Sequence, residues 1–185
     1  MRPLEAIGSD AVAPLAAHYQ ARGHVLPLFE ALGAAKLPVP ARMLLDHDCD
    51  MTPALTAHHG VPLCLRVLRS VEHATTVERT VILMRTSDGE PVEFGAIRIA
   101  TALFPDAARD AVHAGREPLG ALLATHGIVH TSHPQAFFRV TADALIADAL
   151  QCEPGVVLYG RYNALRDGGG ETFARVLEIL PPVMG

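Results

Sequence analysis

Alternating apolar and polar residues predict a β-hairpin over residues 78–105. Two runs rich in Val, Ile and Phe flank the turn at residues 87–90, and its Asp-Gly pair favours a hairpin because the second turn residue needs a positive φ. In the first run, Arg79 alternates in phase with Val81 and Leu83, so its guanidinium is expected on an aliphatic face. An arginine in such surroundings needs an anion. The pattern therefore indicates either a site for a small carboxylate ligand or an ion pair with a neighbouring acid at the sheet edge.

Similar alternation predicts four further strands, over residues 62–73, 129–140, 156–165 and 171–180. The last two strands form a second hairpin around the glycine-rich loop 166–170, and Pro134 interrupts the strand that precedes them. Hairpins with short connections imply a mostly antiparallel sheet of about six strands with helices packed on one face. We therefore expect a single α+β domain over residues 1–185, with a helical N-terminal segment up to residue 50.

Helix signals occupy the segments between these strands. Helices are predicted over residues 11–21, 26–32, 42–45, 51–59, 106–114 and 118–125, with a last short helix that ends at residue 150. We expect Ser9-Asp10, Asp50 and Thr141-Ala142-Asp143 to cap three of these helices. Residues 37–40 are expected to be extended, because each proline disfavours helix in the residue before it.

Composition narrows the class of protein. Half of the 185 residues are hydrophobic, which is typical of a globular chain, and no apolar stretch reaches the ~18 residues that a membrane helix requires. A net charge of −5 without a Lys/Arg cluster argues against nucleic-acid binding. The N-terminus has no hydrophobic signal core, so we expect a cytoplasmic protein. Cys49, Cys64 and Cys152 are sparse and odd in number, which indicates free buried thiols in a reducing compartment.

Two further features suggest chemistry. Glu178 stands in an apolar strand, where it either faces solvent or is buried with a raised pKa and exchanges a proton with a ligand. The glycine-bounded turn at residues 115–120 leads into a helix start, which favours anions but also suits an ordinary helix–turn–helix.

Some of the ten histidines could bind a metal ion, but none of them stands in a recognised metal-binding motif. Those of the His126–His133 segment and of the acidic segment 46–50 are expected to be surface or loop residues, and no cofactor is expected. No nucleophile elbow or catalytic cysteine context is present in the sequence.

A set of short motifs in a common order adds a family resemblance. The motifs are Met51-Thr52, Glu78-Arg79 followed by D-G-E-P, Pro118-Leu119-Gly120, Tyr159-Gly160-Arg161 and Glu178. In this order and spacing, residues 51–182 resemble the chorismate pyruvate-lyase (4-hydroxybenzoate synthase) family. The segment 126–139 does not align with that family, and the strand that begins at Arg79 is about two residues longer, which keeps the same face inward.

The resemblance implies a chorismate lyase-like fold and a role for each matched residue. Arg79 would bind the ring carboxylate, Glu178 would face the ring hydroxyl and move a proton, and Met51, Leu119 and Gly120 would line the site.

We further expect Arg161 to bind a second carboxylate, because chorismate carries two. The implied function is a cofactor-independent lyase that eliminates pyruvate from chorismate to give 4-hydroxybenzoate, as in ubiquinone biosynthesis. The alternative is a non-catalytic domain that binds an aromatic carboxylate, since effector domains of some bacterial transcription regulators have a similar fold. Neither reading involves nucleic acid or a membrane, and the sequence leaves monomer and dimer equally open.

Overall fold

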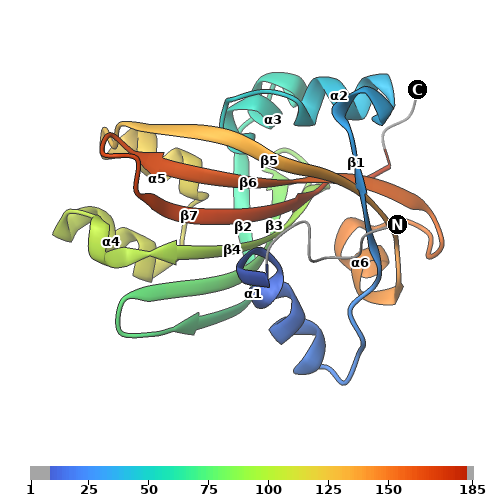
Figure 1. The fold of residues 1–185 in the computed structure, drawn as a ribbon, viewed down its shortest axis with the longest axis horizontal. Coiled ribbons are helices and arrows are strands. Elements are labelled where there is room, and N and C mark those ends of the chain that lie inside the picture. The colour runs from blue at the N-terminus through green and yellow to red at the C-terminus, as the bar shows by residue number, and fades with distance from the viewer. Residues whose placement is uncertain (1–8, 183–185) are drawn as a thin grey trace.

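An antiparallel sheet of seven strands forms the centre of the computed structural model, which describes residues 9–182 and the side chains of residues 12–182 (Figure 1). The strands are β1 (Phe29–Leu32), β2 (Leu63–Glu72), β3 (Thr76–Arg85), β4 (Pro91–Ala100), β5 (His130–Thr141), β6 (Val157–Asp167) and β7 (Thr172–Ile179). Their order across the sheet is β1-β5-β6-β7-β4-β3-β2. Strand β7 thus joins the half of the sheet formed by β1, β5 and β6 to the half formed by β4, β3 and β2.

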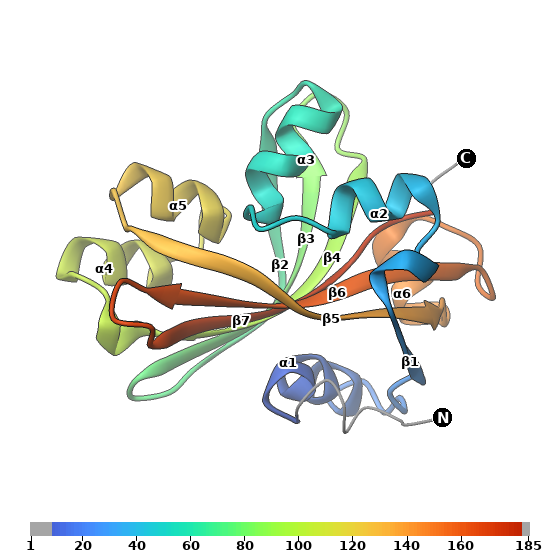
Figure 2. The same ribbon diagram turned by 45° about the horizontal axis from the view of Figure 1, so that its top comes forward.

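Helices cover both faces of this sheet (Figure 2). The α-helices of the described chain are α1 (Ser9–Gln20), α2 (Val39–Leu45), α3 (Met51–His59), α4 (Asp106–Ala114), α5 (Leu119–Thr125) and α6 (Ala144–Leu150). Helices α1 and α6 pack on the face that carries Ile82, Phe94 and Leu177. The other four pack on the face that carries Leu83 and Ile97. The α+β class is confirmed, but the prediction of helices on one face is wrong, because the central strands are apolar on both sides.

Both predicted hairpins are present. Strands β3 and β4 pair around a turn in which Gly89 has a φ of 75°, the positive value that its Asp-Gly pair predicts. Strands β6 and β7 pair around the glycine-rich loop, with Arg161 opposite Glu178. The predicted strand interrupted at Pro134 is one strand, β5, with an irregular register between Pro134 and Ala136.

The predicted helix over residues 26–32 is wrong, and the seventh strand comes from it. Residues 29–32 form β1, in which Phe29 is opposite Val140 and its ring meets that of Phe138 edge to face at 5.1 Å. A short apolar run does not distinguish strand from helix, and here pairing with β5, which is distant in the sequence, decides it.

The predicted helix over residues 42–45 begins earlier than expected. Helix α2 starts at Val39, and Pro40 lies in its first turn, where the missing N–H of proline has no cost. The extended connector predicted over residues 37–40 is therefore shorter than expected.

The expected helix caps have three different outcomes. Asp143 caps α6, since its Oδ1 accepts hydrogen bonds from the N–H groups of Leu145 and Ile146, both at 3.0 Å. Asp50 precedes α3 but makes no capping bond, because its carboxylate is paired with His130. The expected Ser9-Asp10 cap lies outside the described side chains.

The cysteines are free, but none of them is buried as expected: Cys49 is exposed, and Cys64 and Cys152 are partly exposed. In the part of the chain that the structure describes, no helix has the length and apolarity needed to span a membrane.

Candidate functional site

A cavity of about 70 Å³ lies between the sheet and the helices α3, α4 and α5. Its floor is made by the inward-facing residues of β3, β4, β6 and β7. Its roof is made by residues 50–52 at the start of α3, by Val112 of α4 and by residues 117–120 before and within α5. Aliphatic side chains form most of the walls, so each polar group that lines the cavity is held in apolar surroundings.

Five of the six residues singled out from the sequence line this cavity. They are Met51, Arg79, Leu119, Gly120 and Glu178. Gly120 lets α5 approach the start of α3 closely, since a Cβ there would lie 3.2 Å from the Cβ of Thr52. The sixth residue, Arg161, does not line the cavity.

Arg79 is a buried cation with neutral partners only. Its side chain is 5% exposed, its Nε donates to the Ser70 hydroxyl at 3.3 Å, and its Nη2 donates to the backbone carbonyls of Val112 and His113. These carbonyls end α4, where the helix dipole is negative. Burial lowers the pKa of Arg79, but a guanidinium stays charged in proteins.

The geometry around Arg79 leaves a place for an anion. Among the described residues no carboxylate forms an ion pair with Arg79. The neighbouring acid on the edge strand, Glu72, acts on Arg79 only from a distance and is exposed and paired with His113. Its Nη1 makes no hydrogen bond to any described residue. Gly115 permits this arrangement, because a Cβ there would lie 3.0 Å from the guanidinium carbon and its φ is 61°. Arg79 thus lines the cavity with a charge that no carboxylate among the described residues contacts directly.

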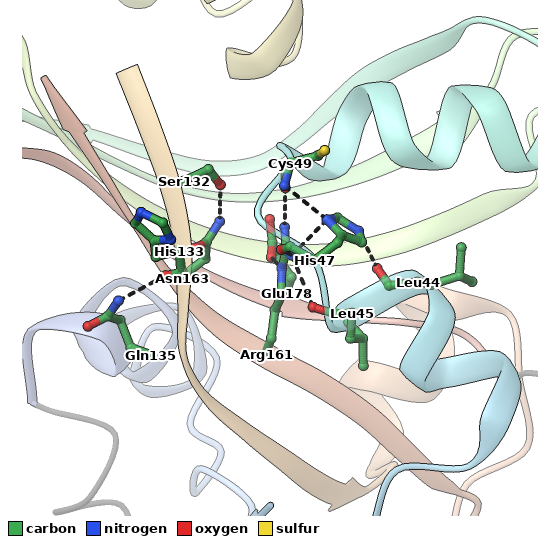
Figure 3. Close-up of polar contacts among 10 residues, drawn as sticks. All are labelled: Leu44, Leu45, His47, Cys49, Ser132, His133, Gln135, Arg161, Asn163 and Glu178. Carbon is green, nitrogen blue, oxygen red and sulfur yellow. Dashed lines mark hydrogen bonds and ion pairs between the residues drawn. The ribbon is translucent and has the colours of Figure 1, made fainter. Parts of the chain in front are cut away.

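Arg161 has the opposite character, because the protein itself occupies its guanidinium (Figure 3). It is fully buried, and its Nε donates to Oε2 of Glu178. Its Nη1 donates to the carbonyls of Leu45 and His47 at 3.1 and 3.0 Å, and its Nη2 donates to the carbonyl of Cys49 at 3.1 Å. Arg161 therefore fastens the segment before α3 to the sheet. Because its donors are occupied and it does not line the cavity, nothing in this geometry supports its expected role in binding a second ligand carboxylate.

Glu93 is a site residue that the sequence analysis missed. It lines the cavity, is 4% exposed, and makes no hydrogen bond or ion pair with any described residue. Its carboxyl lies over Gly95, where a Cβ would come within 2.9 Å of Oε1. Burial and the charge of Glu178 raise the pKa of Glu93 well above its ordinary value. Burial also raises the pKa of Glu178, against the opposing effect of Arg161.

Two further polar groups line the cavity beside these acids. Oδ2 of Asp50 accepts a hydrogen bond from Nε2 of His130 at 2.8 Å. Nδ2 of Asn163 donates to the hydroxyl of Ser132 at 2.8 Å (Figure 3). Within residues 12–182, three buried side-chain atoms have no hydrogen-bond partner: Oδ1 of Asp50, Oε2 of Glu93 and Oδ1 of Asn163. All three belong to residues that line the cavity, and all three are oxygens.

The histidine-rich segment closes one side of this region. Besides the pair with Asp50, His133 contacts Asp48 through Nδ1 at 3.0 Å, so two His–Asp pairs connect the segment before α3 to β5. Across the described side chains, no group of three or more His, Cys, Asp or Glu is placed to hold a metal ion.

Comparison with known proteins gives a fold and no family. No model of a protein family matches the sequence. No curated protein is significantly similar to it. Among solved structures, the effector domain of PhnF from Mycobacterium smegmatis is similar with a TM-score of 0.54 and 12% identity, over 84% of this chain and 98% of that one. A second structure of PhnF has a TM-score of 0.53 and 12% identity, over 74% and 68% of the two chains. The ligand-binding domain of a Bordetella bronchiseptica transcriptional regulator assigned to the GntR family has a TM-score of 0.47 and 15% identity, over 64% and 85%.

These findings confirm the chorismate lyase-like α+β fold and correct the predicted activity. The prediction of a chorismate pyruvate-lyase is wrong, together with its 4-hydroxybenzoate product and its place in ubiquinone biosynthesis, because the similar structures are domains of transcriptional regulators. The motif order that suggested the enzyme belongs to a fold that regulator domains share, so the motifs indicate the fold and not the reaction.

Proposed function

We propose that this chain is a ligand-binding domain that takes up a small organic anion as an effector and does not transform it. The observation that carries the proposal is Arg79, a buried guanidinium that lines the cavity with no carboxylate partner among the described residues. A ligand carboxylate or phosphate would supply the missing charge and accept a hydrogen bond from Nη1. The similarity to an effector domain and to a ligand-binding domain of regulators supports the same function.

The size of the cavity restricts the ligand. A cavity of about 150 Å³ holds a benzene molecule, whereas this one measures about 70 Å³. The aromatic carboxylate implied by the family resemblance, which is larger than benzene, therefore requires the walls of the cavity to move further than an aliphatic acid of a few carbon atoms does. We propose a small aliphatic anion as the first class to test.

The experiment is a titration of the purified chain with acetate, butyrate, benzoate, 4-hydroxybenzoate and inorganic phosphate, followed by calorimetry and by the shift in melting temperature. We expect at least one aliphatic acid to bind, and Arg79→Gln to weaken that binding about 30-fold or more while the chain stays folded. The matched control is Arg166→Gln, which removes an exposed arginine outside the cavity. Equal affinity in the wild type and in Arg79→Gln would overturn the proposal.

A further inference from the structure

The end of the cavity away from Arg79 is unusually rich in oxygen atoms. Glu178 lies opposite Gly95 on β4 and opposite Arg161 on β6. Glu93 is two residues from Gly95 and projects from the same face of the sheet as Glu178, on the side away from Arg79. Asn163 also projects from this face but lies in the row of Arg79, since it is opposite Val176, which is opposite Ile97. Figure 3 shows Asn163 and Glu178 on neighbouring strands below the segment that carries His47 and Cys49. Asp50 lines the cavity from the start of α3.

The charges at this end do not balance. Arg161 compensates Glu178, and His130 is paired with Asp50. Glu93 forms no ion pair with any described residue, and the nearby Arg161 guanidinium is already paired with Glu178, although a buried carboxyl without a partner is among the most costly groups in a protein interior. The missing partner is therefore a group with positive charge or with hydrogen-bond donors.

The unpartnered atoms select between these kinds of group. Glu93 leaves one carboxyl oxygen without a partner at this end, Asp50 and Asn163 each leave one oxygen on the cavity wall, and no unpartnered buried donor is found among the described side chains. An ammonium group has three donors and no acceptor, and its charge would compensate Glu93. A hydroxyl has one donor, brings its own acceptor, and leaves the carboxylate uncompensated.

We propose that the ligand is a short amino acid whose primary amine binds as an ammonium group against Glu93 while its carboxylate binds Arg79. This inference rests on the proposed function and names the substrate class of the same cavity. Arg79 is opposite Ile97 and Glu93 is opposite Leu83, so the two positions are four residues apart along the hairpin, about 13 Å between Cα atoms. Two inward-reaching side chains and a chain of a few carbon atoms span that distance.

Binding of an ammonium group releases a proton. In the empty cavity Glu93 is held as the neutral acid, since burial raises its pKa. The ammonium group stabilises the carboxylate, so the carboxyl O–H bond breaks, the proton leaves to solvent, and the ion pair remains. The charged groups around Glu93 are Glu178 on β7, Arg161 on β6, Asp50 with its partner His130, and Glu117 at the cavity wall.

The test compares matched probes by calorimetry near pH 7: 4-aminobutyrate and 5-aminopentanoate against butyrate, pentanoate and 4-hydroxybutyrate. Each is titrated in two buffers of different ionisation enthalpy that are neither primary amines nor carboxylates, which measures proton release. We expect the amino acids to bind about tenfold or more tightly than their matched acids and to release about one proton per site.

Two variants and a control assign the effect to Glu93. Glu93→Gln should abolish both the advantage of the amine over the matched acid and the proton release. Gly95→Ala should also abolish the advantage, because its methyl group displaces the Glu93 carboxyl without removing its charge. Glu171→Gln, an exposed acid beside the last hairpin loop, should behave as the wild type.

The failures are distinguishable. If butyrate and 4-aminobutyrate bind equally and Arg79→Gln abolishes both, the proposed anion site stands and the amine site is overturned. Equal affinity of 4-hydroxybutyrate and 4-aminobutyrate also overturns it, since a neutral donor would then suffice. If no probe binds the wild-type chain, both proposals are overturned together.

Discussion

The two faces of the sheet treat buried polar groups in opposite ways. On the face covered by α1 and α6, the Tyr19 hydroxyl donates to Asp143 at 2.8 Å, and the Thr80 hydroxyl donates to the carbonyl of Pro14 at 3.4 Å. On the face covered by α2 to α5, the buried residues include two arginines and two glutamates, and Arg79 and Glu93 lack a partner of opposite charge among the described residues. The buried polar groups on the first face find their partners within the protein, whereas several on the second face do not.

This difference separates stability from binding in one sheet. A buried polar atom without a partner costs about 1–3 kcal/mol, which packing on the other face must offset. A ligand that supplies the missing partners recovers that free energy on binding and stabilises the folded chain. A ligand therefore gains the most binding free energy on the face whose buried polar groups lack partners.

The largest expected effect on stability comes from Arg161, the arginine on the cavity face whose donors all have partners within the protein. Arg161→Met should lower the free energy of unfolding by about 3–5 kcal/mol, because it leaves Glu178 buried without its cation and removes the donors to the segment before α3. Urea denaturation measures the change. The double variant Arg161→Met with Glu178→Met should recover part of the loss, since it removes both charges. A loss below about 1 kcal/mol in the single variant would contradict this assignment.

A matched pair of glycines compares the two faces directly. A Cβ at Gly160 would lie 2.2 Å from the backbone oxygen of Glu178 and 2.4 Å from a ring carbon of Phe138, so Gly160→Ala should cost about 3 kcal/mol. At Gly95 the nearest atom is the end of the flexible Glu93 side chain, so Gly95→Ala should cost less than about half as much. Chemical denaturation of both variants tests the order, and a larger loss in Gly95→Ala would reverse the comparison.

The pH dependence of the free energy of unfolding should reveal the unpartnered Glu93 on the cavity face. The pKa of Glu93 is raised in the folded chain, so the folded state keeps a proton that the unfolded state has released. The contribution of Glu93 to stability should therefore fall as the pH rises above its ordinary pKa of 4.5. Glu93→Gln does not titrate, and its stability relative to the wild type should rise over the same range. Parallel pH profiles of the two proteins would show that Glu93 ionises normally.

The smallest expected effect lies on the closed face. Tyr19→Phe removes the hydrogen bond to Asp143, which keeps its bonds to the first N–H groups of α6. The expected loss is about 1 kcal/mol, the net value of one buried hydrogen bond. Thermal and urea unfolding measure it, and the affinity for any ligand of the cavity should not change. A changed affinity would mean that the two faces are coupled.

Local signals predicted much of this fold. Helix α4 has the predicted bounds, and the turn at Gly89 follows from its Asp-Gly pair. Strand β1 was missed because its conformation depends on pairing with β5, more than a hundred residues away in the chain. The second covered face was missed because apolar residues on both sides of a strand do not say which helices lie on each side.

Part of the candidate site was also predicted from the sequence, namely the residues whose position follows from local alternation or from the family resemblance. Alternation placed Arg79 on an inward face, and the family resemblance added four more residues that line the cavity. Glu93 was missed although it satisfies the argument applied to Glu178, an acid within an apolar strand. The partners of Arg161 were not predictable, because they lie on a segment about 115 residues earlier, at His47 and its neighbours.

The central place of β7 makes folding and binding sequential. Among residues 9–182 it is the last strand to leave the ribosome, yet it lies between β6 and β4 (Figure 1). Until it inserts, the two halves of the sheet share no hydrogen-bonded edge, and the cavity lacks Glu178. Long-range pairings such as that of Phe94 with Ile179 are also slow to form. The cavity therefore acquires its full set of polar groups only after β7 has inserted between β6 and β4.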